Sequence, residues 1–194
     1  MKARRGTVGL VVALLAMFGI ELVTNSVGNN ASLLKLGALP DNGELNEQYW
    51  RFATYSFLHF NWLHLLVNAA LLLWIGRIVE RRVGIAQAGM IYFSSVLSSA
   101  TIILLVHSLH PKVGATVGAS GGVFGLLGAA LIISYRQNRI RFGRERRLRA
   151  GLWVAILAGL GISLLPDISM AGHIGGLIGG PLLACIVRIR EDEG

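Results

Sequence analysis

The residues best suited to chemistry are a serine and a histidine, each in a glycine-rich apolar segment. Ser120 follows Gly118 and Ala119 and precedes two further glycines, and His173 follows Gly172. A neutral imidazole beside a serine hydroxyl can take the hydroxyl proton as the oxygen attacks a carbonyl carbon. It can then return that proton to the leaving amine. The pair is therefore the minimum set for nucleophilic acyl transfer.

The oxyanion formed by such an attack needs hydrogen-bond donors. Candidate donors are the backbone N–H of Ser120, the amide of Asn68 and the ring of His64. Because His64 and Asn68 are four residues apart, they share one face of a helix. No membrane carboxylate is available to orient the imidazole, which predicts a dyad rather than a triad. Phe124, one helical turn after Ser120, is placed to pack on the ring of His173.

Two other interpretations of Ser120 are open from this stretch alone. The serine can be the N-cap of a small-residue packing helix. The sequence Gly-Ala-Ser-Gly-Gly also matches the nucleophile elbow of soluble hydrolases. An elbow requires a strand before the serine, within a chain of alternating strands and helices, and the sequence shows neither.

The composition favours a membrane protein. The 194 residues are 54% hydrophobic and only 14% charged, which is too apolar for an ordinary soluble domain. The net charge of +8 comes mainly from arginines at the ends of apolar segments, where topology determinants lie. A nucleic-acid partner is therefore not expected, whereas the arginine-rich loop after residue 135 can attract anionic membrane lipid.

The apolar segments predict an all-α, polytopic membrane protein with one domain, 1–194. Six transmembrane helices are expected at 7–24, 64–79, 85–106, 117–135, 151–165 and 170–187, with an outer loop at 25–63. Lysine and arginine number three, two, three, one, seven, none and two in the successive connections and tails. High and low values alternate, which places both termini in the cytoplasm by the positive-inside rule.

This topology brings the polar residues to one depth. The second, fourth and sixth helices run inward, and His64, Ser120 and His173 lie near their starts. A position three to five residues into a helix is roughly 5 to 8 Å below its outer end. Glycines four residues apart in the fourth and sixth helices predict close packing of these helices. Ser120 and His173 are therefore expected to meet just below the outer surface.

With these residues, the chain resembles the rhomboid family of intramembrane serine proteases over nearly its whole length. The residues that carry the resemblance are Trp50, Arg51, His59, His64, Asn68, Gly76, Glu80, Gly84, Gly118, Ala119, Ser120, Gly121, Gly172, His173, Gly176 and Gly180. The resemblance implies a six-helix rhomboid-like bundle in its bare form, without a sizeable soluble domain.

The resemblance also implies roles for individual residues. Ser120 is the expected nucleophile and His173 the expected base, and His64 and Asn68 join the Ser120 backbone in the oxyanion hole. The supporting residues are His59, Gly118 and Phe124. Two positions depart from the commonest pattern, since Phe124 stands where many members have tyrosine and Gly172 where alanine is frequent.

The function implied is hydrolysis of a peptide bond in or next to a transmembrane segment of a substrate protein, near the outer membrane face. Transmembrane proteins are then the partners, and neither a cofactor nor a metal is expected. The compact form favours a prokaryotic plasma membrane. By resemblance, the fifth helix, expected to be the shortest and to be broken by Pro166 and Asp167, is the substrate gate.

Two alternatives to a serine protease stay open. His59, His64 and His173 could meet as metal ligands, although no carboxylate or thiolate is expected at their depth. A catalytically silent rhomboid-like protein for binding or quality control is the other. Of three further charged residues, Glu21 is expected at the membrane interface, and Arg51 and Glu80 are expected to tie loop ends together.

Overall fold

The computed structural model describes residues 5–137, 142–166 and 168–190, with only the backbone of 142–144. Asp167 and the ends of the predicted domain lie outside these residues. Helices dominate, and they lie over each of the six ranges expected to span the membrane. Their bounds are α1 Arg5–Val23, α4 Trp62–Leu71, η2 Leu72–Gly76, α5 Arg77–Val83, α6 Ile85–Leu109, α7 Ser120–Arg136, α8 Phe142–Ile162 and α9 Met170–Ala184.

The second predicted span is a continuous helix made of three parts. The first part, α4, continues through a π-helical turn, η2, into α5. Together they cover Trp62–Val83, which, like α1 and α6, is long and apolar enough to cross a membrane by length and composition. The apolar helices α7 and α9 are shorter.

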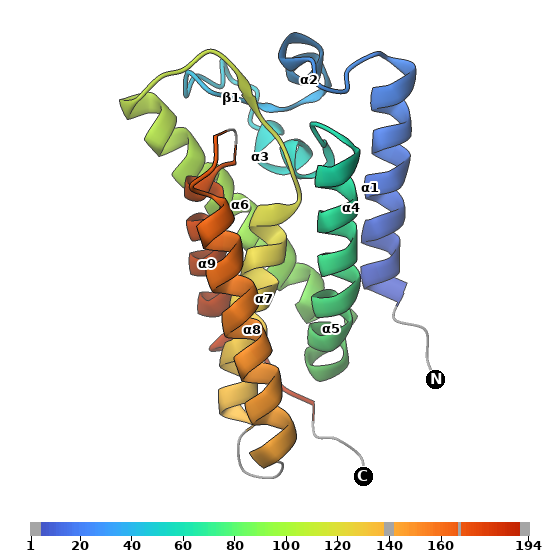
Figure 1. Ribbon diagram of the computed structural model, residues 1–194, viewed down its shortest axis with the longest axis vertical. Coiled ribbons are helices and arrows are strands. Elements are labelled where there is room, and N and C mark those ends of the chain that lie inside the picture. The colour runs from blue at the N-terminus through green and yellow to red at the C-terminus, as the bar shows by residue number, and fades with distance from the viewer. Residues whose placement is uncertain (1–4, 138–141, 167, 191–194) are drawn as a thin grey trace.

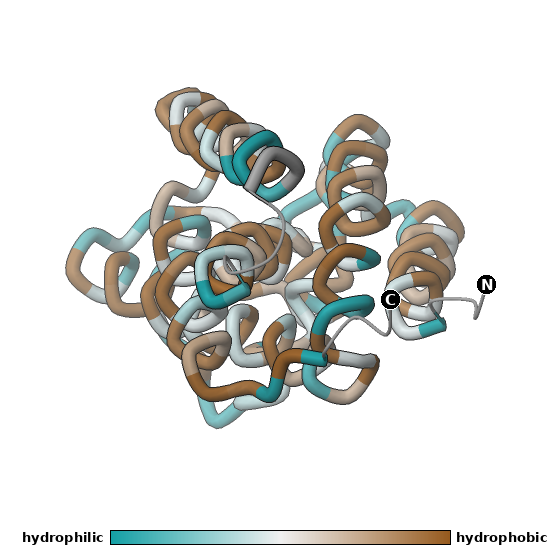
Figure 2. The backbone as a smooth tube through the Cα atoms, turned by 90° about the horizontal axis from the view of Figure 1, so that it is seen from below, coloured by the Kyte–Doolittle hydropathy of each residue, from teal (hydrophilic) through white to brown (hydrophobic). Residues whose placement is uncertain are grey.

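The centre of the bundle is α7 (Figure 1). Thirteen of its 17 residues are buried, so this helix packs against protein rather than lipid. Its main neighbours are α9 and α6, with α8 on another side. Many large hydrophobic side chains on the other helices are exposed, among them Val12, Leu66, Leu97, Val154 and Leu182. Figure 2, which looks along the bundle, shows long hydrophobic stretches on the helices and hydrophilic residues mainly towards their ends.

Glycines determine how closely α7 and α9 approach. A Cβ atom on Gly176 would collide with the carbonyl oxygen of Gly121, and one on Gly180 would collide with that of Gly125. The other side of α9 is equally close to α6, because a Cβ on Gly175 would lie 2.6 Å from the Cα of Ser99. The close packing predicted from the glycine spacing is confirmed.

The outer loop is folded rather than irregular. It contains α2 (Asn30–Leu36), β1 (Leu39–Pro40), α3 (Arg51–Thr54) and η1 (Tyr55–Phe57). The strand β1 pairs antiparallel with β2 (Ala115–Thr116), which joins the loop to the segment before α7. This two-stranded pair, the sheet of the described part of the chain, is not the parallel sheet that a soluble nucleophile elbow requires.

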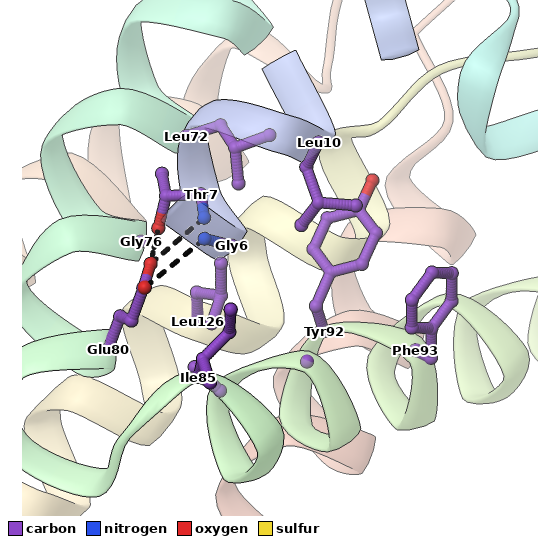
Figure 3. Close-up of a pocket in the computed structure, with 12 residues that line it drawn as sticks. Gly6, Thr7, Leu10, Leu72, Gly76, Glu80, Ile85, Tyr92, Phe93 and Leu126 are labelled. Carbon is purple, nitrogen blue, oxygen red and sulfur yellow. Dashed lines mark hydrogen bonds between the residues drawn. The ribbon is translucent and has the colours of Figure 1, made fainter. Parts of the chain in front are cut away.

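Two charged residues stabilise the fold: Arg51 ties loop segments together, as expected, whereas Glu80 joins two helices. Arg51 donates hydrogen bonds to the carbonyl oxygens of Leu34 at 2.7 Å and Ala38 at 2.5 Å, so it ties the outer loop together. Glu80 on α5 accepts bonds from the backbone N–H groups of Gly6 at 3.2 Å and Thr7 at 2.9 Å, and from the Thr7 hydroxyl at 2.7 Å (Figure 3). Its carboxylate thus caps the first turn of α1, where unpaired N–H groups favour negative charge.

Two expectations from the sequence were wrong. Glu21 is fully buried instead of interfacial, because its carboxylate accepts the backbone N–H of His59 at 3.0 Å and fixes the end of the outer loop. The fifth helix is not the shortest: α8 has 21 residues and begins at Phe142. The arginine-rich segment continues the helix outside the apolar run, and Glu145 near its start forms an ion pair with Arg82 at 2.6 Å.

Candidate active site

Ser120 begins the central helix without capping it. It is the first residue of α7, and Ala119 occupies the N-cap position without a side-chain hydrogen bond. The N-cap interpretation of Ser120 is therefore wrong. Gly118, two residues earlier, has φ +129°, a conformation that L side chains rarely adopt. The chain thus turns sharply before α7 and presents Ser120 half-buried at its start.

His64 lies beside this turn. A Cβ atom on Gly118 would be 2.7 Å from Nε2 of His64 and 3.8 Å from Oγ of Ser120, so the ring and the hydroxyl flank the same point. Glycine is required here for space as well as for backbone conformation. His64 lies in the first turn of α4, where the side chain of Asn61 accepts its backbone N–H at 2.9 Å.

Asn68 is one turn further along α4 and is buried. Its Nδ2 donates to the carbonyl oxygen of His64 at 3.0 Å. An amide NH₂ group has two donors, so one remains for another acceptor. His64 and Asn68 are therefore on one helical face, as the spacing predicted.

His173 is held by side chains from two other helices. It lies on α9 and is buried, and its ring stacks on Phe124 of α7 with centroids 4.0 Å apart and an interplanar angle of 9°. Its Nδ1 is 2.5 Å from the hydroxyl oxygen of Ser163, at the end of α8. The stacking was predicted, whereas Ser163 was missed, since a serine after an apolar helix has no distinguishing pattern in a single sequence.

Ser120 and His173 make no hydrogen bond with each other within the described chain. Because Nδ1 of His173 faces Ser163, its Nε2 is the nitrogen available to Ser120. Catalytic hydrogen bonds are often long or absent without substrate and tighten only in the substrate complex.

His59 supports this group of residues from the outer loop. Its ring is fully buried and meets the ring of His64 edge to face, with centroids 5.1 Å apart. Burial, together with the neighbouring His64, lowers the pKa of His59 to about 3, so this ring is neutral at physiological pH. Its Nδ1 lies 3.3 Å from the carbonyl oxygen of Phe57. The ring of His64 is thus packed against a neutral neighbour.

Comparison with known proteins identifies the family of this chain. The family model described as "Rhomboid domain" matches residues 46–190. The chain belongs to the rhomboid family. As a rhomboid it is an integral membrane protein built as a helical bundle.

Named relatives of this rhomboid come from bacteria, plants and a protozoan. Rhomboid protease GluP of Bacillus subtilis is 31% identical over 94% of this chain and 35% of its own length. RHOMBOID-like protein 1 of Arabidopsis thaliana is 28% identical over 95% of this chain and 54% of its own length. Rhomboid-like protease 3 of Toxoplasma gondii is 28% identical over 97% of this chain and 72% of its own length. The chain spans about half or less of the length of the first curated relatives that it matches.

The candidate site of this rhomboid has no evident metal ligands. Across residues 5–137, 142–166 and 168–190, no group of three or more His, Cys, Asp or Glu side chains could hold a metal ion. A separate cavity of about 210 Å³ lies between α1, η2, α5 and α6 (Figure 3). It is lined by Thr7, Glu80 and Tyr92 among others and contains none of the predicted site residues. This cavity is therefore not part of the candidate active site at the start of α7.

Proposed function

We propose that this rhomboid is an intramembrane serine protease that hydrolyses a peptide bond in or next to a transmembrane segment of its substrate. The observation that carries the proposal is the stacking of His173 on Phe124, one turn after Ser120 on the same helix. This contact fixes the imidazole next to the helix that bears the hydroxyl. A serine and a neutral histidine so arranged suffice for acyl transfer.

In the proposed first step, Ser120 Oγ attacks the carbonyl carbon of the substrate while Nε2 of His173 takes the hydroxyl proton. The resulting imidazolium then gives the proton to the leaving amine, which departs as the acyl-enzyme forms. In the second half of the reaction a water molecule, deprotonated by the same nitrogen, attacks the acyl carbon, and the imidazolium returns the proton to Ser120 Oγ as the acyl group leaves as a carboxylic acid. No carboxylate takes part, so the base works as half of a dyad.

The oxyanion of each tetrahedral intermediate is proposed to bind at the start of α7. The backbone N–H of Ser120 belongs to the first turn, where N–H groups lack helical partners and the helix dipole favours negative charge. The ring of His64 flanks Gly118, and the second N–H of Asn68 is the third candidate donor. Donors held in advance around the developing charge are typically the largest electrostatic contribution to catalysis.

Cleavage is proposed near the outer face of the membrane, with both termini in the cytoplasm. Ser120 is the first residue of α7 and Arg136 the last, about 24 Å apart along the helix axis. Arg136 donates to the carbonyl oxygen of Ala184 at 2.6 Å, so α7 and α9 end together at the arginine-rich side. The positive-inside rule assigns that side to the cytoplasm. Location in a prokaryotic plasma membrane is part of the same proposal.

Labelling with a fluorophosphonate tests the mechanism directly. The detergent-solubilised protein is expected to form one covalent adduct, located on Ser120 by peptide mass spectrometry. Ser120→Ala and His173→Ala should abolish both labelling and cleavage of a transmembrane substrate. Ser108→Ala, which removes an exposed hydroxyl, should change neither. An adduct on another serine, or cleavage by Ser120→Ala, would contradict the proposal.

One observation favours a second candidate, a catalytically silent rhomboid that binds membrane proteins. Ser120 and His173 are not hydrogen-bonded to one another in the described chain. A folded wild-type protein that neither labels nor cleaves but still captures a transmembrane protein would support this candidate. The presence of both reactive side chains favours the protease.

A further inference from the structure

Besides Phe124, the side chain of Ser163 contacts the proposed base, His173. Ser163 follows the last residue of α8 and is only 5% exposed. Its Oγ lies 2.5 Å from Nδ1 of His173 and 2.8 Å from the carbonyl oxygen of Gly159. The backbone N–H of Ser163 also donates to Gly159, at 3.1 Å, so the serine is fixed to the final turn of α8.

These two contacts determine where the protons lie. A carbonyl oxygen can only accept, so the single hydroxyl proton of Ser163 is directed to Gly159. The lone pairs of Oγ therefore face His173, and Nδ1 must be the donor of that short hydrogen bond. A neutral imidazole with its proton on Nδ1 has a bare Nε2. That tautomer is the one that can accept a proton from Ser120.

We propose that Ser163 is a positioning residue that holds His173 in the tautomer with Nε2 unprotonated. This inference rests on the proposed protease function. In a Ser-His-Asp triad, a buried carboxylate holds the imidazole in this tautomer by accepting from Nδ1. Here a neutral hydroxyl has that role, and the carbonyl of Gly159 orients the hydroxyl.

The two contacts on His173 come from different elements and do different things. Phe124 of α7 fixes the plane of the ring, while Ser163 at the end of α8 fixes its rotation within that plane. Gly159 of α8 also lies against the ring of Phe124, since a Cβ there would collide with its Cζ, so a displacement of α8 would affect both the stack and the contact with Nδ1. The proton position on the base is thus tied to the position of α8.

Kinetics on variants of the full-length protein test this role. Ser163→Ala should lower kcat roughly fivefold and leave KM unchanged, because one neutral hydrogen bond is worth about 1 kcal/mol. Ser163→Thr keeps the hydroxyl and should restore most of the loss. Ser134→Ala removes another buried hydroxyl, one without a partner in the described chain, and should leave kcat as in the wild type. A Ser163→Ala protein with wild-type kcat would overturn the inference.

Nitrogen-15 NMR of histidine-labelled protein provides a readout that a merely structural role would not change. Nδ1 of His173, assigned by comparison with His173→Asn, should have the shift of a protonated nitrogen and Nε2 that of an unprotonated one. Ser163→Ala should shift this balance towards the proton on Nε2. A wild-type ring with its proton on Nε2 would overturn the inference, even if Ser163→Ala fails to fold.

The same experiments separate this inference from the proposed function. A wild-type protein that does not label at Ser120, yet has the proton of His173 on Nδ1, would refute the protease and retain the positioning contact. Labelling at Ser120 together with a proton on Nε2 would retain the protease and refute the role of Ser163.

Discussion

The rings of Phe124 and His173 are stacked, with centroids 4.0 Å apart and planes 9° from parallel. The first ring belongs to α7, which also carries Ser120, and the second to α9. The helices α7 and α9, which pack closely at their glycines, are thus also joined by an aromatic contact at the candidate site. The contact is made by a phenylalanine ring, without a hydroxyl group.

Replacing Phe124 by leucine tests this contact. Phe124→Leu should lower the cleavage rate about tenfold, because an aromatic pair contributes about 0.5–1.5 kcal/mol beyond its buried area. Phe124→Tyr retains the ring and should cleave at close to the wild-type rate. Initial rates on one transmembrane substrate, with fluorophosphonate labelling as a second measure, decide between them. Equal rates for the leucine and wild-type proteins would show that the stack does not position His173.

Much of this arrangement could be predicted from the sequence because it depends on local patterns. Apolar length predicts helices, and glycines four residues apart predict the contact between α7 and α9. The spacing from Ser120 to Phe124 predicts a ring one turn below the hydroxyl, and the stack with His173 confirms it.

What could not be predicted depends on tertiary contacts between distant segments. Glu21 looked interfacial because it lies near the end of α1, but the outer loop folds over it and brings the N–H of His59 to its carboxylate. Ser163 acquires its importance only when the end of α8 meets His173 of α9. The start of α8 at Phe142 was missed because the prediction relied on runs of apolar residues, and the first turns of this helix contain many charged residues.

The glycine contact between α7 and α9 should not tolerate a methyl group. In Gly176→Ala the new Cβ would collide with the carbonyl oxygen of Gly121, which is backbone and cannot yield. We expect a loss of about 1–3 kcal/mol of stability, typical of overpacking, and a lower thermal midpoint in detergent. Gly161→Ala in α8 is the matched control, since nothing lies within 4 Å of its Cβ position. A midpoint as high as that of the control would argue against close packing here.

The cap that Glu80 forms on α1 should contribute to stability and not to catalysis. Glu80→Ala leaves the N–H groups of Gly6 and Thr7 and the Thr7 hydroxyl without this acceptor. Since a buried donor without a partner costs about 1–3 kcal/mol, the thermal midpoint should fall clearly. Glu80→Gln keeps an acceptor oxygen and should lose less, and Glu44→Ala, at an exposed position, should lose nothing. A large fall in kcat well below the midpoint would indicate a different role for Glu80.

Treatment with a chelator distinguishes a Ser-His dyad from a metal site formed by His59, His64 and His173. The Nδ1 atom of His173 is already bonded to Ser163, and the rings of His59 and His64 meet edge to face. We expect 1,10-phenanthroline or EDTA to leave the rate of cleavage unchanged. Loss of activity on chelation, with recovery on addition of zinc, would favour the metal site.

The buried ring of His59 predicts how stability depends on pH. Its pKa is about 3 in the folded protein, against 6.5 for an unperturbed histidine, so below pH 6.5 the unfolded chain binds a proton that the folded chain does not. The free energy of unfolding should therefore fall as the pH decreases from about 6.5 towards 3. For one proton the slope is at most about 1.4 kcal/mol per pH unit. In His59→Gln this contribution should disappear, whereas His110→Gln, at an exposed site, should keep the wild-type slope. Denaturation curves at several pH values measure it, and an unchanged slope in His59→Gln would show that His59 is not the group responsible.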